Sequence, residues 1–202
     1  MLEAIEAAHR AGCHTFVGAG SQAEYGYYNR PISEDSPTFP VTAYGIAKLC
    51  AGQMGNVLCR KLNINYVWPR IFSVYGPYDG DNTMIMKGIR SILNKEVPLF
   101  TKGEQEWDYL YSEDAAYMIY CLAENAAGNN DRYIYCLGSG STKKISDYID
   151  IMRKSIDIYI YSIISTNPKI NKGKLSTIIE IKTERILILY LYILIFSQYL
   201  LY

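Results

Sequence analysis

The chain has 202 residues, with 20 acidic and 20 basic side chains and a formal net charge of zero. A chain of this length can bury a sizeable core, and its balanced charge argues against a nucleic-acid partner, which normally requires a basic excess. The two histidines, His9 and His14, leave little material for a metal site, and the five cysteines form no Cys-x-x-Cys pair. We therefore expect no metal, and reduced, buried thiols in a cytoplasmic protein.

The first part of the chain predicts a helix, a strand and a turn. Apolar Leu2, Ile5 and Ala8 repeat at helical spacing before Gly12, and a short buried-type strand follows at 14–19. Gly20-Ser21-Gln22 then forms a turn at the carboxyl end of that strand. Ligands bind at this position in open α/β sheets.

Helices and strands alternate along the rest of the chain up to about Lys154. We expect helices at 42–62, 83–93, 112–125 (capped by Ser112) and 144–153, strands at 65–71, 97–100 and 133–137, and an extended segment at 107–111. Alternation of this kind predicts an α/β fold with a parallel, helix-covered sheet.

Tyr44 and Lys48 lie four residues apart at the start of the helix expected over 42–62. Residues at i and i+4 share one helix face. An ammonium beside a phenol favours the phenolate, a base able to take a proton from an alcohol near neutral pH. Among 20 tyrosines this is the only Tyr-x-x-x-Lys. Chance alone supplies about one such spacing, so a tyrosine that merely packs on the core remains an alternative.

Four stretches with matching order and spacing resemble the extended short-chain dehydrogenase/reductases, specifically the NAD-dependent nucleotide-sugar epimerase/dehydratase family. They are 16–26, the helix that carries Tyr44 and Lys48, 69–77 and 107–114. The resemblance covers about residues 1–154. It implies the carboxyl-side half of a partial Rossmann-type, doubly wound parallel sheet, with a fragment of the small substrate domain. The family's Gly-x-Gly-x-x-Gly unit is not matched, because Gly18-x-Gly20 is followed by Ala23 at the third glycine position.

The resemblance also implies a cofactor, NAD or NADP, and a nucleotide-diphosphate sugar as substrate. Ser21 falls at the catalytic Ser/Thr, Tyr44 at the acid/base, and Lys48 at the residue that holds the nicotinamide ribose. Phe72 matches a position that borders the nicotinamide, and Ser73 and Asn82 match contacts to the sugar nucleotide. For these residues a turn, core or capping role remains the alternative.

Two departures from the family pattern bear on the reaction. The 4,6-dehydratases carry Asp-Glu after the catalytic residue, where this chain has Gln22-Ala23. This favours epimerisation or 4-keto-sugar reduction. Trp107 stands where many members have an arginine that binds the diphosphate, and Arg90 or Lys87 could substitute for it.

The composition changes after Ser155, beyond which there is no Ala or Val. We expect 155–202 to be a tail foreign to the family, apolar at 186–202. These 17 residues are short of the roughly 20 that span a bilayer. We therefore favour a loss of the ancestral reading frame after Arg153 over a membrane anchor.

Two interpretations of the whole chain remain. One is an enzyme whose family commonly forms a homodimer through the helix with Tyr44. The other is an inactive, truncated remnant. Because the glycine unit that cradles the pyrophosphate is not matched, we expect this chain to bind NAD weakly or not at all.

Overall fold

The computed structural model describes residues 1–94, 96, 100–127 and 133–166, and side chains as far as Ile156 within the last helix. The chain separates into two units. The first comprises Met1–Val74 and Asp108–Gly140, and the second comprises Tyr75–Trp107 and the chain from Ser141 onward.

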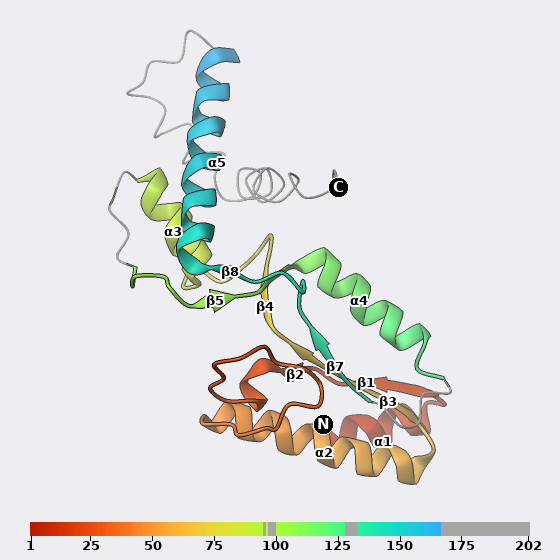
Figure 1. Ribbon diagram of the computed structural model, residues 1–202. Coiled ribbons are helices and arrows are strands. Elements are labelled where there is room, and N and C mark those ends of the chain that lie inside the picture. Colours follow the sequence, from red (N-terminus) through yellow and green to blue (C-terminus); the bar gives the residue numbers. More distant parts are fainter. Residues whose placement is uncertain (95, 97–99, 128–132, 167–202) are drawn as a thin grey trace. The chain divides into compact units, whose positions relative to one another are not determined.

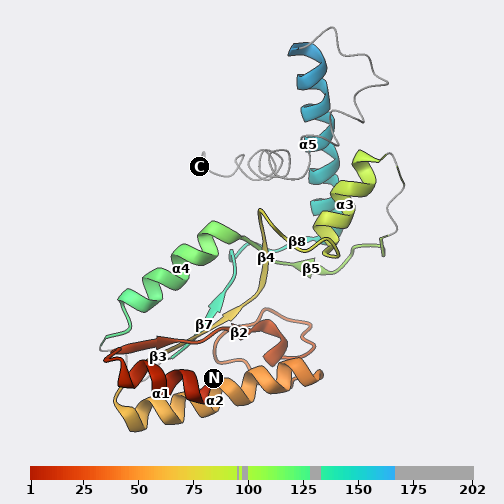
Figure 2. The same ribbon diagram turned by 180° about the vertical axis from the view of Figure 1, so that it is seen from behind.

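The first unit is built on a parallel sheet. Its central strand is β3 (Asn65–Ile71), which pairs on one side with β1 (Thr15–Val17) and β2 (Gly20–Ser21) and on the other side with β7 (Ile134–Leu137). All these pairings are parallel. The predicted α/β class with a parallel sheet is therefore confirmed. Helices α1 (Leu2–Arg10) and α2 (Ala43–Leu62) cover one face, and α4 (Ser112–Glu124) covers the other (Figures 1 and 2).

A proline explains why two short strands pair with the same edge of β3. Thr15 pairs with Asn65 and Gly20 with Arg70, so β1 and β2 keep one register. The backbone N–H of Gly18 donates to Val67 O at 2.9 Å. The next ladder bond on this edge would need the N–H of residue 69, which is proline and has none. The ladder is thus interrupted at Gly18 and Ala19.

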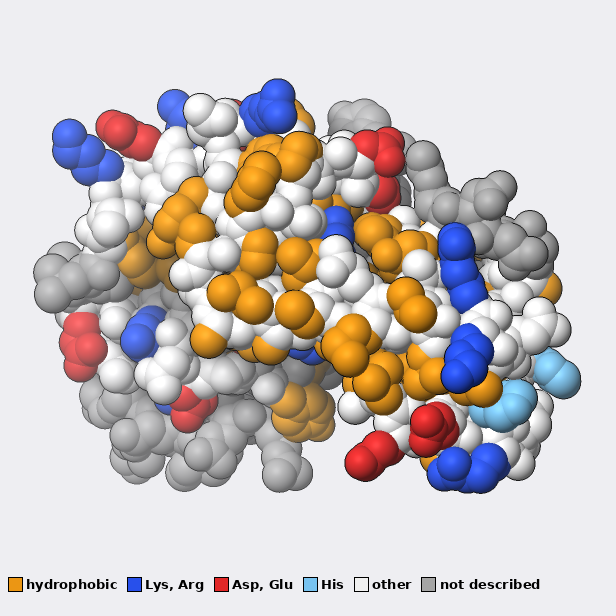
Figure 3. All heavy atoms as spheres, turned by 90° about the horizontal axis from the view of Figure 1, so that it is seen from below, with side chains coloured by type: hydrophobic (Ala, Val, Ile, Leu, Met, Phe, Trp, Pro, Cys, Tyr) orange, Lys and Arg blue, Asp and Glu red, His pale blue; other side chains and the backbone are white. Residues whose placement is uncertain are grey.

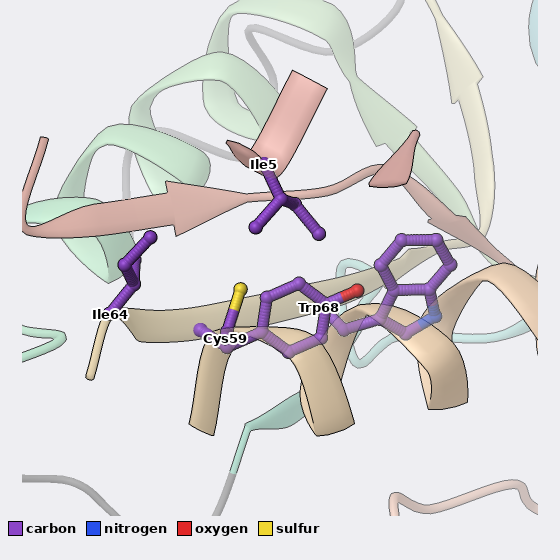
Figure 4. Packing of buried hydrophobic residues seen from close by; sticks show 5 residues of the cluster. Ile5, Cys59, Ile64 and Trp68 are labelled. Atoms are coloured by element: carbon purple, nitrogen blue, oxygen red, sulfur yellow. The ribbon is translucent and has the colours of Figure 1, made fainter. Parts of the chain in front are cut away.

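Successive side chains of β3 point to opposite faces of the sheet. On the α1/α2 side, Tyr66 and Trp68 join a buried cluster with Ile5, Cys59 and Ile64, which Figure 4 shows converging from α1, α2 and β3. On the α4 side the buried residues are Leu110, Ala115 and Leu137. Both faces of the sheet are therefore buried beneath helices, as expected for the predicted helix-covered sheet.

Glycines bring α2 close to the sheet. A Cβ added at Gly52 would lie 2.6 Å from the Trp68 ring, and one added at Gly55 would collide with the Tyr66 hydroxyl. Glycine inside a helix costs about 1 kcal/mol relative to alanine. The direct stacking of aromatic rings against the helix backbone offsets this cost, because each large ring buries its surface there.

The second unit packs two helices together. These are α3 (Met84–Leu93), capped by Thr83, and α5 (Ile145–Thr166). Gly88 of α3 faces the Met152 side chain of α5, where an added Cβ would lie 3.2 Å away. The short strands β5 (Glu106–Trp107) and β8 (Lys143–Lys144) pair antiparallel beside the start of α5. β4 (Ser73–Tyr75), at the edge of the first unit, pairs with β6 (Tyr109–Tyr111).

Several expectations from the sequence were wrong in detail. Ser112 is the first helical residue of α4, and the cap position is Tyr111, which makes no side-chain capping bond. The helix expected to end at Arg153 continues as α5 to Thr166. Cys13 and Cys50 are exposed, whereas Cys59 is buried and burial raises its pKa from 9.0 to about 11.

Two expectations fall partly or wholly outside the described residues. They concern the strand at 97–100, of which only residue 100 is described, and the apolar run at 186–202. In the part of the chain that the structure describes, no helix is both long and apolar enough to cross a membrane.

The buried Tyr66 hydroxyl should lower the stability of the fold, and one substitution tests this. Among the described residues it is the buried side-chain polar atom that has no hydrogen-bond partner, and burial raises the pKa of Tyr66 above its ordinary value. Because an unsatisfied buried hydroxyl is destabilising, Tyr66→Phe should raise the free energy of unfolding by about 1 kcal/mol. Urea unfolding measures this, with Tyr120→Phe as the control at an exposed tyrosine. A loss of stability in Tyr66→Phe relative to the control would contradict the assignment.

Candidate active site

The Ser21 turn begins where β2 ends. Ser21 is extended, with φ −150° and ψ 148°, and caps the short 3₁₀ helix η1 (Gln22–Glu24). Its Oγ accepts a hydrogen bond from the Ala23 N–H at 3.2 Å, and its own N–H donates to Glu24 Oε1 at 2.8 Å. This reciprocal arrangement is a capping box. Accepting the bond from Ala23 does not use the Ser21 hydroxyl proton, which can be donated to a bound group.

Tyr44 and Lys48 occupy the first turns of α2. Thr42 caps the helix by accepting from the Gly45 N–H at 3.0 Å. Lys48 Nζ lies 5.6 Å from the centroid of the Tyr44 ring, as the i,i+4 spacing predicts. It also donates to the Ala19 carbonyl at 2.9 Å, in the gap between β1 and β2. The Tyr44 side chain is 57% exposed, so this tyrosine is not buried in the core.

Gly45 joins the two halves of the candidate site. A Cβ at this position would collide with the backbone oxygen of Ala23, two residues after Ser21. The start of α2 therefore lies directly against η1. The structure thus brings the elements that carry Ser21, Tyr44 and Lys48 together at the carboxyl end of the β1/β2 edge.

A buried ion pair lies beneath the Ser21 turn and was missed in the sequence analysis. Glu24 is 0% exposed and Arg70 is 3% exposed. Glu24 Oε2 accepts from Arg70 Nε at 2.7 Å, and its two oxygens accept from Trp68 Nε1 at 3.0 and 3.2 Å. The spacing Ser21-x-x-Glu24 is a capping-box signature and could have revealed the bond to Ser21. Nothing in the sequence indicates that Arg70 shares the same carboxylate.

Phe72 is connected to this network through Tyr25. The rings of Tyr25 and Phe72 meet edge to face with centroids 6.4 Å apart, and the Arg70 guanidinium carbon lies 4.5 Å from the Tyr25 centroid. The Tyr25 hydroxyl lies 3.1 Å from Cys136 Sγ. Burial is the main reason why the pKa values of Tyr25 and Cys136 are raised. Phe72 is therefore half-buried against the η1 turn, which fits a packing role and leaves cofactor contact a prediction.

The two predicted substrate contacts lie in different units. Ser73 is the first residue of β4 and is half-buried. Asn82 is exposed in the turn before α3, in the second unit. Arg90 of α3, one candidate for diphosphate binding, is paired with Asp81 of that turn. The roles of all these residues stay predictions; the structure shows that the elements carrying Ser21, Tyr44 and Lys48 are in contact within the first unit.

Replacing Gly45 tests the contact that holds the group together. Gly45→Ala should gain about 1 kcal/mol in helix propensity but lose about 1–3 kcal/mol because its methyl group displaces Ala23. We expect net destabilisation and a displaced η1 turn, measured by thermal unfolding and by the amide NMR shift of Ser21. Gly80→Ala is the control, because a Cβ there meets its nearest atom at 3.9 Å. A stabilised Gly45→Ala with an unchanged Ser21 shift would show that helix and turn are not in contact.

Several curated proteins are similar in sequence to this chain. A UDP-glucose epimerase of Bacillus subtilis, described as uncharacterised, is 30% identical over 111 residues, which are 54% of this chain and 35% of that protein. A dTDP-4-dehydro-6-deoxyglucose reductase of Escherichia coli is 29% identical over 145 residues, covering 69% of this chain and 45% of that protein. The chain thus spans less than half the length of either relative.

Solved structures show the same fold. A UDP-glucuronic acid 4-epimerase of Bacillus cereus in complex with NAD matches with a TM-score of 0.70 at 24% identity, covering 77% of this chain and 50% of that one. A protein named RMD from Pseudomonas aeruginosa, complexed with NADPH, matches with a TM-score of 0.65 at 22% identity, covering 76% of this chain and 55% of that one. The model of the NAD dependent epimerase/dehydratase family matches residues 1–138. The chain therefore belongs to the NAD dependent epimerase/dehydratase family.

Proposed function

We propose that this chain carries the proton-transfer half of an NAD- or NADP-dependent nucleotide-sugar epimerase or 4-keto-sugar reductase. One observation carries the proposal: the Ser21 turn and the Tyr44/Lys48 helix lie in direct contact at the carboxyl end of a parallel strand. Ligands bind at this end of open α/β sheets. A phenol, an ammonium and a hydroxyl in one place can hold a sugar hydroxyl and move its proton.

The residues present fit a nicotinamide cofactor. Lys48 has three N–H donors and uses one on Ala19 O, so two remain for ribose hydroxyls. Tyr44 is exposed beside it. When bound, NAD or NADP would supply the acceptor and donor of the hydride. Tyr44 would take the proton from the sugar hydroxyl and return it, and Ser21 would donate a hydrogen bond that orients that hydroxyl.

The local chemistry disfavours dehydration. Elimination of water from a sugar ring needs an acid and a base besides the tyrosine. Positions 22 and 23 are Gln and Ala, and the next acid, Glu24, is fully buried and bonded to Arg70. Epimerisation and ketone reduction need no acid and base besides the tyrosine, and two of the sequence relatives are named for those reactions.

The two units support a further proposal about domain organisation. The first unit, with its parallel sheet, would be the carboxyl-side half of a doubly wound nucleotide-binding sheet. The parts of the second unit up to about residue 154 would belong to the small substrate domain, and 155–202 would be a tail foreign to the family. On this proposal Asn82 belongs to the substrate domain, and the other predicted site residues belong to the first unit.

Turnover by the 202-residue chain tests the proposed reaction. With NAD and UDP-glucose the chain should form the 4-epimer, detected by NMR. With a reduced cofactor and a 4-keto-sugar nucleotide it should instead consume the cofactor. Tyr44→Phe should lower kcat by about 10²–10⁴ and leave NAD affinity, measured by calorimetry, within about twofold, because only the proton carrier is lost. Tyr120→Phe, an exposed tyrosine of α4, is the control. Retained turnover in Tyr44→Phe would exclude its role, and absence of turnover in the wild-type chain would favour an inactive remnant.

We also propose that a second copy of the chain covers the exposed face of α2. Ile46, Cys50, Met54 and Val57 are exposed at helical spacing, and Val57 is 68% exposed. Figure 3 shows hydrophobic side chains gathered on the face where α1 and α2 lie. An apolar stripe of this kind can pair with itself about a twofold axis.

The proposed dimer predicts a sharp effect of charge on α2. Sedimentation of the wild-type chain at micromolar concentration should give a dimer, and Val57→Glu should give a monomer because the carboxylate would be buried in the interface without a partner. Tyr120→Glu removes a similarly exposed apolar side chain from α4 and should leave the dimer intact. A monomeric wild-type chain would refute the proposal.

A further inference from the structure

The Glu24 carboxylate is the acceptor on which several donors beneath the candidate site converge. It is fully buried. Oε1 accepts from the Ser21 N–H at 2.8 Å and from Trp68 Nε1 at 3.0 Å, and Oε2 accepts from Arg70 Nε at 2.7 Å. Every one of these groups is a donor, so an acceptor-only carboxylate suits the position better than an amide.

Gly20 makes room for this convergence. A Cβ at Gly20 would lie 2.7 Å from Trp68 Nε1, 2.9 Å from Glu24 Oε1 and 2.9 Å from the Pro69 carbonyl. Only a residue without a side chain therefore lets the carboxylate and the indole meet directly behind Ser21. Gly20 and Glu24, on either side of Ser21 in the sequence, thus both take part in holding the Ser21 turn.

The ion pair connects β3 to the Ser21 turn. Burying two charges is expensive, and apolar residues of similar volume often serve as well or better. Here Arg70 contacts one oxygen of the carboxylate, and the other holds the backbone of Ser21. The position of Arg70 in β3 therefore fixes the carboxylate, and the carboxylate fixes the Ser21 peptide. The Ser21 Oγ is in turn directed by the Ala23 N–H.

We propose that Glu24 is a positioning residue for Ser21, with Arg70 as its anchor: it sets the orientation of the Ser21 hydroxyl through the Ser21 backbone N–H. The consequence for turnover rests on the proposed function. The orientation itself does not, because it follows from the described contacts alone. A serine held in this way needs no reorganisation when a substrate hydroxyl binds.

Two double variants separate positioning from stability. Glu24→Met/Arg70→Met and Glu24→Gln/Arg70→Gln both remove the ion pair without leaving one buried charge alone. Only the glutamine at 24 retains an acceptor oxygen for the Ser21 N–H. Amide hydrogen exchange of Ser21 is compared in each protein with that of Gly18, whose N–H bonds to Val67 in the sheet and reports on sheet stability.

In the Met/Met variant, Ser21 exchange should accelerate relative to Gly18 by roughly tenfold to a hundredfold, the effect of losing one hydrogen bond to a charged group. In the Gln/Gln variant the ratio should stay within about threefold of wild type. Glu24→Leu/Arg70→Leu, which also lacks an acceptor oxygen at position 24, should give the same acceleration and decides the question if the Met/Met variant does not fold. Equal ratios in the variant without an acceptor at position 24 and in the Gln/Gln protein would overturn the proposal.

Turnover gives an independent readout. If the wild-type chain is active, kcat of the Met/Met variant should fall about a hundredfold with KM and NAD affinity unchanged, the cost of a small misplacement, and Gln/Gln should restore it. An unchanged kcat in Met/Met would count against positioning. A wild-type chain without turnover would refute the proposed function, and the exchange ratio would still decide the role of Glu24.

Discussion

The close approach of α2 to the sheet is the constraint on which the rest of the first unit depends. Gly45 lies against the Ala23 carbonyl, and Gly52 lies against Trp68. Three glycines in a 20-residue helix lower its intrinsic stability, so the helix must be held by tertiary contacts. The same approach places the first turn of α2 against the Ser21 turn. Packing and the geometry of the candidate site therefore have one common cause.

The polar network continues the apolar core. Tyr66, Trp68 and Arg70 project from the same face of β3, and burial is nearly complete for all three. Tyr66 and Trp68 pack against α2, and Arg70 then meets Glu24 beneath the turn. A charged pair at the end of an aromatic row is satisfied only in one register of β3 against β2. It can thus contribute specificity of register as well as orientation of Ser21.

The sequence predicted local features well because local causes set them. The strand over Asn65–Ile71 is as predicted, and the helix expected over 42–62 is α2, Ala43–Leu62. Both follow from sequence patterns that extend over only a few residues. The i,i+4 geometry of Tyr44 and Lys48 is a property of any helix. In contrast, the pairing of Glu24 with Arg70 depends on strand register across 46 residues, and β8 exists because it pairs with β5. The strand over 65–71 was predicted despite Pro69, whose effect on the neighbouring edge was not.

That effect of Pro69 links the sheet to Lys48. A proline in a central strand removes one ladder donor, and the edge facing it breaks into β1 and β2. Ala19 lies in the break, and its carbonyl accepts from Lys48 Nζ. A long, flexible lysine side chain loses considerable rotamer freedom when it is fixed. Because this bond fixes Lys48 within the fold, part of that loss is incurred before any ligand binds. An irregularity in the sheet thereby preorganises the ammonium beside Tyr44, on the same turn-and-helix surface where Glu24 orients Ser21.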